Sequence, residues 1–209
     1  MSLYDRLDGW IARLCTTVAV LGGLGLIFAI VVTCVSIILK MTRRTLDATV
    51  GQIMSSDAWG SIRPILGEEE LVSYGVGLAL FAALPWAIYT RAHVKIDLFE
   101  SRFGVRLNKL LDLIGDLLFA AIAYLILTRQ WYKIFKKPRR NNESELDLLF
   151  QGDVAGFLSR IRSADETQIL GLKLWPLYSL AELFVLIFLI VAVFCVYRSA
   201  RAFLGRDAA

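Results

Sequence analysis

The chain has 209 residues, of which 57% are hydrophobic, and its formal net charge is +4. A soluble domain is usually about 45–50% apolar, and here the excess is gathered into a few long blocks. This distribution predicts an all-α integral membrane protein, because a helix needs about 20 apolar residues to cross a bilayer. The basic residues flank the apolar blocks, so we expect them to contact lipid headgroups and do not expect nucleic-acid binding.

The cysteines and the single histidine limit the chemistry that the chain can support. Cys15, Cys34 and Cys195 all fall within apolar blocks, with no CxxC motif and no metal-ligand spacing. We therefore expect them to be free, buried and small hydrophobic residues. A haem held by two histidines cannot be built from His93 alone. The sequence predicts no metal, no cofactor and no catalytic residue.

The first predicted span covers residues 14–39, which carry no charge. Its glycines let a second backbone approach closely in a membrane, so this face is predicted to pack on a neighbour. These glycines are candidates for a subunit interface: Gly22, Gly23 and Gly25. A polar loop is expected over residues 40–67.

The second predicted span covers residues 71–90 and follows three glutamates. The last of them, Glu70, sits where a helix begins and where the helix dipole favours negative charge. Pro85 is expected to kink this span.

An amphipathic helix is predicted in the membrane interface between the second and third spans. Asp97 and Glu100 resemble a capping box, and apolar residues recur beyond them at three- and four-residue spacing: Phe99, Phe103, Leu107, Leu110 and Ile114. This pattern is typical of a helix lying on a membrane surface. His93 lies one turn before Asp97 if this stretch is helical, which fits an interfacial ion pair or cap and leaves a proton relay open.

The third predicted span covers residues 110–127 and carries Asp112 and Asp116 within its first two turns. We expect both carboxylates to reach the interface or Lys109. A second polar loop is expected over residues 129–173.

The fourth predicted span covers residues 177–197 and is opened by Trp175 and Pro176. Proline is tolerated in the first turn of a helix. Glu182 lies inside this apolar span and is therefore a candidate for function, for dipole stabilisation or for pairing with a partner subunit.

Charge leaves the orientation of this single membrane domain undecided. Four spans place both termini on one side. If that side is the cytoplasm, ten of the 23 Lys and Arg residues lie inside and thirteen lie outside. The positive-inside rule fails by this count, although charge in long translocated loops is weaker evidence.

Nothing in the chain resembles a P-loop, a GxSxG elbow or an HExxH helix. One alternative is a small four-helix membrane enzyme or redox subunit, for which paired His or paired Cys residues would be diagnostic. Another is a stand-alone channel or exporter, which would need a polar stripe through the depth of a span.

The second span and the residues that directly follow it resemble a family signature. Glu70 precedes the run Ala-Leu-Pro-Trp-Ala-Ile-Tyr-Thr-Arg-Ala over residues 83–92, which is followed by His93-Val-Lys-Ile-Asp97. Together with four spans and the Trp175–Pro176 pair, this resembles the small membrane subunit (the Q, or DctQ-like, component) of tripartite ATP-independent periplasmic (TRAP) transporters. The two long polar loops depart from the usual pattern.

The resemblance implies a bacterial inner-membrane protein with both termini in the cytoplasm. It also implies a non-catalytic scaffold for a large membrane subunit that takes up an organic acid, often a dicarboxylate or sialic acid, with sodium. A periplasmic substrate-binding protein would deliver the acid. The implied partners are these two proteins and membrane lipids.

Overall fold

The computed structural model describes residues 3–49, 65–92, 105–135 and 145–204. Within these ranges the chain is helical, with isolated β-bridges in place of strands. Four of the described helices are long and apolar enough to cross a membrane, as the sequence predicted. They are α1 (Leu3–Thr49), α2 (Glu68–Tyr89), α3 (Val105–Ile134) and α6 (Trp175–Phe203), and two short helices precede the last, α4 (Glu145–Phe150) and α5 (Val154–Ser159).

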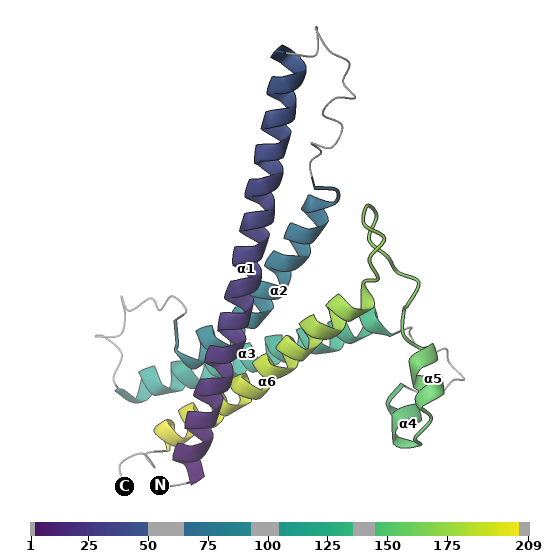
Figure 1. Ribbon diagram of the computed structural model, residues 1–209. Coiled ribbons are helices and arrows are strands. Elements are labelled where there is room, and N and C mark those ends of the chain that lie inside the picture. Colours follow the sequence, from purple (N-terminus) through teal and green to yellow (C-terminus); the bar gives the residue numbers. More distant parts are fainter. Residues whose placement is uncertain (1–2, 50–64, 93–104, 136–144, 205–209) are drawn as a thin grey trace.

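The four long helices form two pairs (Figure 1). Helix α1 packs along α2, α3 packs along α6, and the pairs meet where α2 contacts α6. The start of α1, the end of α2, the start of α3 and the end of α6 lie together, and we call this the terminal end. The opposite end, where α2 and α6 begin, is called the loop end.

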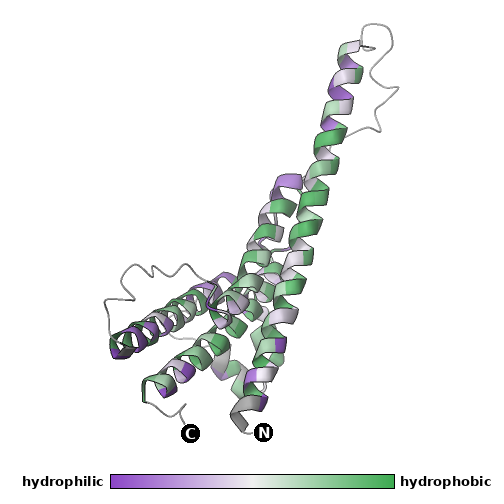
Figure 2. Cartoon of the chain, turned by 90° about the vertical axis from the view of Figure 1, so that its left-hand side faces the viewer, coloured by the Kyte–Doolittle hydropathy of each residue, from purple (hydrophilic) through white to green (hydrophobic). Residues whose placement is uncertain are grey.

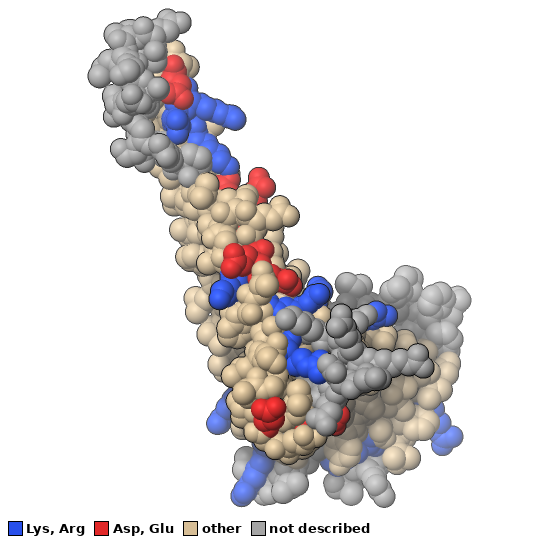
Figure 3. Space-filling model, turned by 90° about the vertical axis from the view of Figure 1, so that its right-hand side faces the viewer, with Lys and Arg blue, Asp and Glu red and all other residues tan. Residues whose placement is uncertain are grey.

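Helix α1 continues well beyond its predicted span. Its 47 residues make a rod about 70 Å long, whereas the hydrocarbon core of a bilayer is about 30 Å thick. The residues 40–49, predicted as the start of a loop, are helical. Figure 2 shows hydrophilic residues at this end of α1, and Figure 3 shows charged side chains gathered there.

The main apolar core lies toward the terminal end and draws on all four long helices. Its buried members are Ile11, Cys15, Ile88, Ala123, Phe188, Val191 and Cys195. A smaller cluster of Val18, Ala82 and Phe184 adjoins it. Cys15 and Cys195 are free and buried as expected, but Cys34 is exposed, so that part of the expectation was wrong.

Close packing of α1 on α2 depends on Gly22. A Cβ atom at this position would lie 2.6 Å from the Cβ of Ala82 and 3.2 Å from the carbonyl oxygen of Ala79. Hydrogen at this position therefore lets the two backbones approach. The glycine-rich face predicted to pack on a neighbour does so within the chain at this residue.

The segment before α6 folds back on itself, and we call residues 165–174 the hairpin turn. The amide of Thr167 donates to the carbonyl of Leu172 at 2.8 Å, and the amide of Leu174 donates to the carbonyl of Asp165 at 3.0 Å. Gly171 takes a left-handed conformation, φ 62°, inside the turn. Upstream, the amide of Arg162 donates to the carbonyl of Ile134, which ties this segment to the end of α3.

The predicted interfacial helix falls mainly on residues 93–104, which lie outside the described residues. Its final portion, from residue 105 to residue 109, is the first turn of α3. The third span therefore belongs to a helix that begins earlier than predicted and continues to Ile134.

Candidate functional site: polar clamps at the two ends of α2

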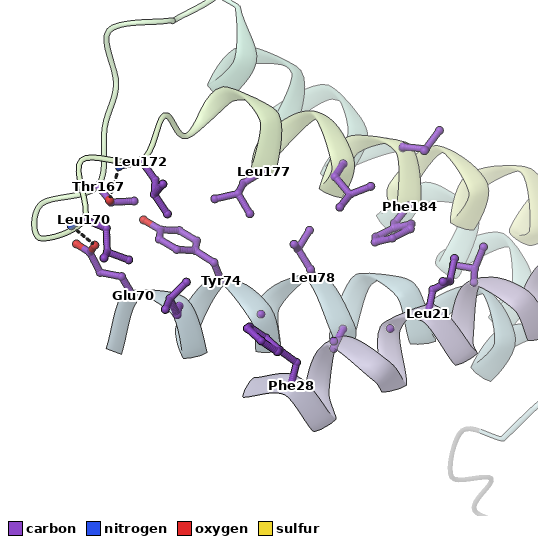
Figure 4. A pocket seen from close by; sticks show the side chains of 18 of the residues that line it. Leu21, Phe28, Glu70, Tyr74, Leu78, Thr167, Leu170, Leu172, Leu177 and Phe184 are labelled. Carbon is purple, nitrogen blue, oxygen red and sulfur yellow. Dashed lines mark hydrogen bonds between the residues drawn. The ribbon is translucent and has the colours of Figure 1, made fainter. Parts of the chain in front are cut away.

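The first polar feature is the start of α2, where Glu70 holds the hairpin turn. The Glu70 carboxylate accepts a hydrogen bond from the amide of Leu170 at 3.2 Å (Figure 4) and another from the amide of Ile169 at 3.0 Å. We call this arrangement the Glu70 clamp. It links the first turn of α2 to the segment that leads into α6.

Gly67 makes this approach possible in two ways. It precedes α2 in a left-handed conformation, φ 67°, which glycine adopts without strain. A Cβ atom at Gly67 would also lie 2.4 Å from Cγ of Leu170, so a larger residue would push the turn away. Beside it, an ion pair between Lys40 and Glu68 ties α1 to α2.

The second polar feature is the end of α2, where Arg91 reaches two other helices. Its guanidinium donates to Oδ2 of Asp112 at 2.8 Å and to Oγ of Ser199 at 3.0 Å, and it lies 3.9 Å from Oδ2 of Asp116. The Ser199 hydroxyl donates to the buried Asp116 carboxylate. We call these four residues the Arg91 cluster, and it joins α2 to α3 and α6.

The backbone of Arg91 is itself unusual. Its φ of 52° is left-handed, and a non-glycine residue in that region carries strain of about 1–3 kcal/mol. The amide of Arg91 donates to the carbonyl of Ile88, and the next amide donates to the carbonyl of Ala87. Glycine is the common residue at such a helix end, so the arginine side chain and its ion pairs explain why the strain is tolerated.

A neighbouring group of side chains adds α1 to this junction. The Tyr89 hydroxyl donates to Oδ1 of Asp8 at 3.1 Å. Arg198 donates to the carbonyl of Tyr89 at 3.2 Å, and its guanidinium carbon lies 5.5 Å from the centre of the Tyr89 ring. Every long helix is therefore connected at the terminal end through polar side chains.

Three of the motif residues predicted from the sequence lie within the described residues. Glu70 is in the clamp, whereas Trp175 and Pro176 are the first residues of α6. His93 and Asp97 lie outside the described residues.

The candidates for a subunit interface fall in different environments. Gly22 is buried against α2, and Glu182 is 9% exposed, with neither carboxylate oxygen bonded to another described residue. Gly23 is exposed with open space beside it, and Gly25 lines a cavity described below.

Sequence reasoning missed Arg91, Ser199 and Asp8. A signal was available for the first, because Arg91 directly follows an apolar span while two aspartates lie one turn apart at the start of another. Asp112 and Asp116 were predicted to reach the interface or Lys109, and both lie near Arg91. Lys109 donates to the carbonyl of Ala202 on α6 at 3.0 Å.

The Arg91 cluster joins helices, and the Glu70 clamp joins α2 to the hairpin turn. In the Arg91 cluster the charges pair with each other, and in the Glu70 clamp the carboxylate is bonded to backbone amides. Within the described ranges, no three His, Cys, Asp or Glu side chains gather as metal ligands.

These features define the class of the protein, a multi-pass helical membrane protein whose polar residues join its helices at both ends of α2. Residues 48–205 match the family described as "Tripartite ATP-independent periplasmic transporters, DctQ component", and the chain belongs to this family. The resemblance found in the sequence is thereby confirmed. The match begins at the end of α1 and leaves most of that helix outside. No curated protein and no solved structure matched the chain.

Proposed function

We propose that this chain is the small, non-catalytic membrane subunit of a TRAP transporter and scaffolds the large membrane subunit. The large subunit would carry an organic acid together with sodium, after a periplasmic binding protein delivers the acid. Members of this family are components of tripartite transporters. This membership argues against the alternative of an unrelated enzyme or redox subunit.

The observation that carries the scaffold role is the Arg91 cluster. Here Asp112 and Asp116 pair with Arg91, and Arg91 also bonds Ser199 on α6. These charges brace three helices into one body, which suits a subunit that supports another.

The same proposal sets the orientation. With the terminal end in the cytoplasm, the Glu70 clamp, α4, α5 and the far end of α1 face the periplasm. The binding protein docks on that side in the proposed assembly, so residues 40–49 of α1 and the described residues 145–173 would lie on the side where it docks.

Co-purification tests this role. The chain, carrying an affinity tag, is expressed with the large subunit and extracted in mild detergent. We expect the two to elute together at a fixed ratio, and we expect cells lacking this chain to lose sodium-dependent uptake while keeping the large subunit. An unrelated tagged four-helix membrane protein serves as the control. Elution of the chain alone, with uptake unaffected by its deletion, would overturn the proposal.

A further inference from the structure

An apolar cavity of about 590 Å³ lies between the α1/α2 pair and α6 (Figure 4). Helix α1 contributes Phe28 and Leu21, α2 contributes Leu78, and α6 contributes Leu177 and Phe184. The cavity begins where the core clusters stop, because α2 and α6 diverge from there toward the loop end. The hairpin turn covers it at that end, with Leu170 and Leu172 in the lining.

The polar side chains of the lining sit together at the loop end. They are Glu70, Tyr74 and Thr167, as Figure 4 shows. The Glu70 carboxylate is bonded to two amides of the hairpin turn, and the Thr167 hydroxyl accepts from the amide of Leu172 at 3.0 Å. The deeper part of the cavity is therefore lined by apolar side chains, and the polar side chains of the lining lie at the loop end.

The three helical walls have similar lengths. The lining runs from Val18 to Phe28 on α1, from residue 70 to residue 79 on α2, and from residue 177 to residue 187 on α6. At 1.5 Å per residue each wall is about 15 Å long, which is half of the roughly 30 Å hydrocarbon core. On α2 and α6 the cavity therefore begins at the loop end of the predicted span and ends near its middle, a depth of about one leaflet.

The depth of the cavity decides between the two kinds of occupant that a membrane offers. A transmembrane helix would continue through the other leaflet, where the core clusters close the gap between the helix pairs. Hydrocarbon chains are narrower than a helix and end within their own leaflet.

We propose that this cavity binds the acyl tails of a phospholipid from the leaflet at the loop end. The lipid wedges between the α1/α2 pair and α6 and fills the space that the diverging helices leave. The wall contributed by α1 lies outside the matched residues 48–205, so the family match does not account for this site. The proposal needs the chain to be in a membrane and does not depend on its transport role.

Photocrosslinking tests the proposal. The full chain, alone and in complex with the large subunit, is reconstituted in phosphatidylethanolamine and phosphatidylglycerol vesicles that contain a phospholipid with a photoreactive acyl tail. We expect adducts to concentrate on the peptides of α2 and α6 that carry Leu78 and Leu183. Native mass spectrometry of the detergent-extracted chain should show a retained phospholipid.

Two neighbouring glycines provide the variant and its control. Gly25 lines the cavity with nothing within 4 Å of an added Cβ atom, and Gly23 has the same open space outside the lining. Gly25→Phe should reduce the adducts on these peptides several-fold, and Gly23→Phe should leave them at the wild-type level. Thermal unfolding of both variants checks that they fold. If Gly25→Phe does not fold, Leu180→Trp on the opposite wall provides a second variant that fills the cavity.

Each result bears on the proposal. Adducts that are equal in both filling and control variants, or spread evenly over the lipid-facing side of α1, would overturn it. So would loss of the adducts in the complex together with crosslinks from this cavity to the large subunit, because a partner helix would then occupy the space.

Discussion

Gly22→Ala is the substitution whose effect follows most directly from the coordinates. The added methyl carbon would lie 2.6 Å from the Cβ of Ala82, whereas carbon atoms in contact prefer about 3.5–4.0 Å. Neither atom belongs to a flexible side chain, so α1 and α2 must separate by about 1 Å. The carbonyl oxygen of Ala79, at 3.2 Å, blocks a simple rotation.

Two opposing contributions set the change in the free energy of unfolding that Gly22→Ala causes. Overpacking a well-packed contact costs about 1–3 kcal/mol, whereas replacing glycine by alanine inside a helix gains about 0.5–1 kcal/mol. Gly23→Ala supplies the second term by itself, because nothing lies within 4 Å of a Cβ atom there. The difference between the two variants therefore isolates the steric cost, about 1–3 kcal/mol in favour of Gly23→Ala.

Thermal unfolding in detergent, followed by circular dichroism, measures this difference. For a protein of this size, 1 kcal/mol shifts the midpoint by about 2–4 °C, so Gly22→Ala should melt several degrees below Gly23→Ala. A Gly22→Ala variant that melts at or above Gly23→Ala would refute the close packing of α1 on α2.

Three further predictions concern the Arg91 cluster, the Glu70 clamp and the proposed orientation. Asp116→Ala should lower the free energy of unfolding by about 1–3 kcal/mol, because the buried Ser199 hydroxyl loses its acceptor, and an unchanged denaturation midpoint would contradict the Arg91 cluster. Glu70→Ala should speed hydrogen exchange of the amides in the hairpin turn that the carboxylate accepts from, as seen by mass spectrometry, and wild-type exchange would argue against the clamp. In a chain whose native cysteines are replaced by alanine, Ser163→Cys should react with an impermeant thiol reagent added from the periplasm and Leu204→Cys should not; the reverse pattern would invert the topology.

Hydropathy located the spans because it reports which residues tolerate lipid, but it does not report where a helix stops. The residues 40–49 looked like a loop because they include Lys40, Arg43 and Asp47. All are compatible with a helix in water, and Arg43 and Asp47 are four residues apart with N and O atoms 3.8 Å from each other. The helix therefore leaves the apolar zone without ending.

Long-range partners were the part that local pattern could not supply. Glu70 was singled out from the sequence, but its partners are amides 99 and 100 residues away. Backbone amides carry no residue-type signal, so the clamp was invisible before the fold was known. Ser199 was missed for a related reason, since a serine near the end of an apolar helix is common and 83 residues separate it from Asp116.

The central claim, that this chain supports a transporter without transporting by itself, is tested most directly by uptake into proteoliposomes with a sodium gradient. The large subunit is reconstituted with and without this chain, and the chain is also reconstituted alone, each with the binding protein and its labelled organic acid. We predict uptake when both membrane subunits are present and the level of empty vesicles for the chain alone. Uptake by the chain alone, or full uptake by the large subunit without it, would contradict the account.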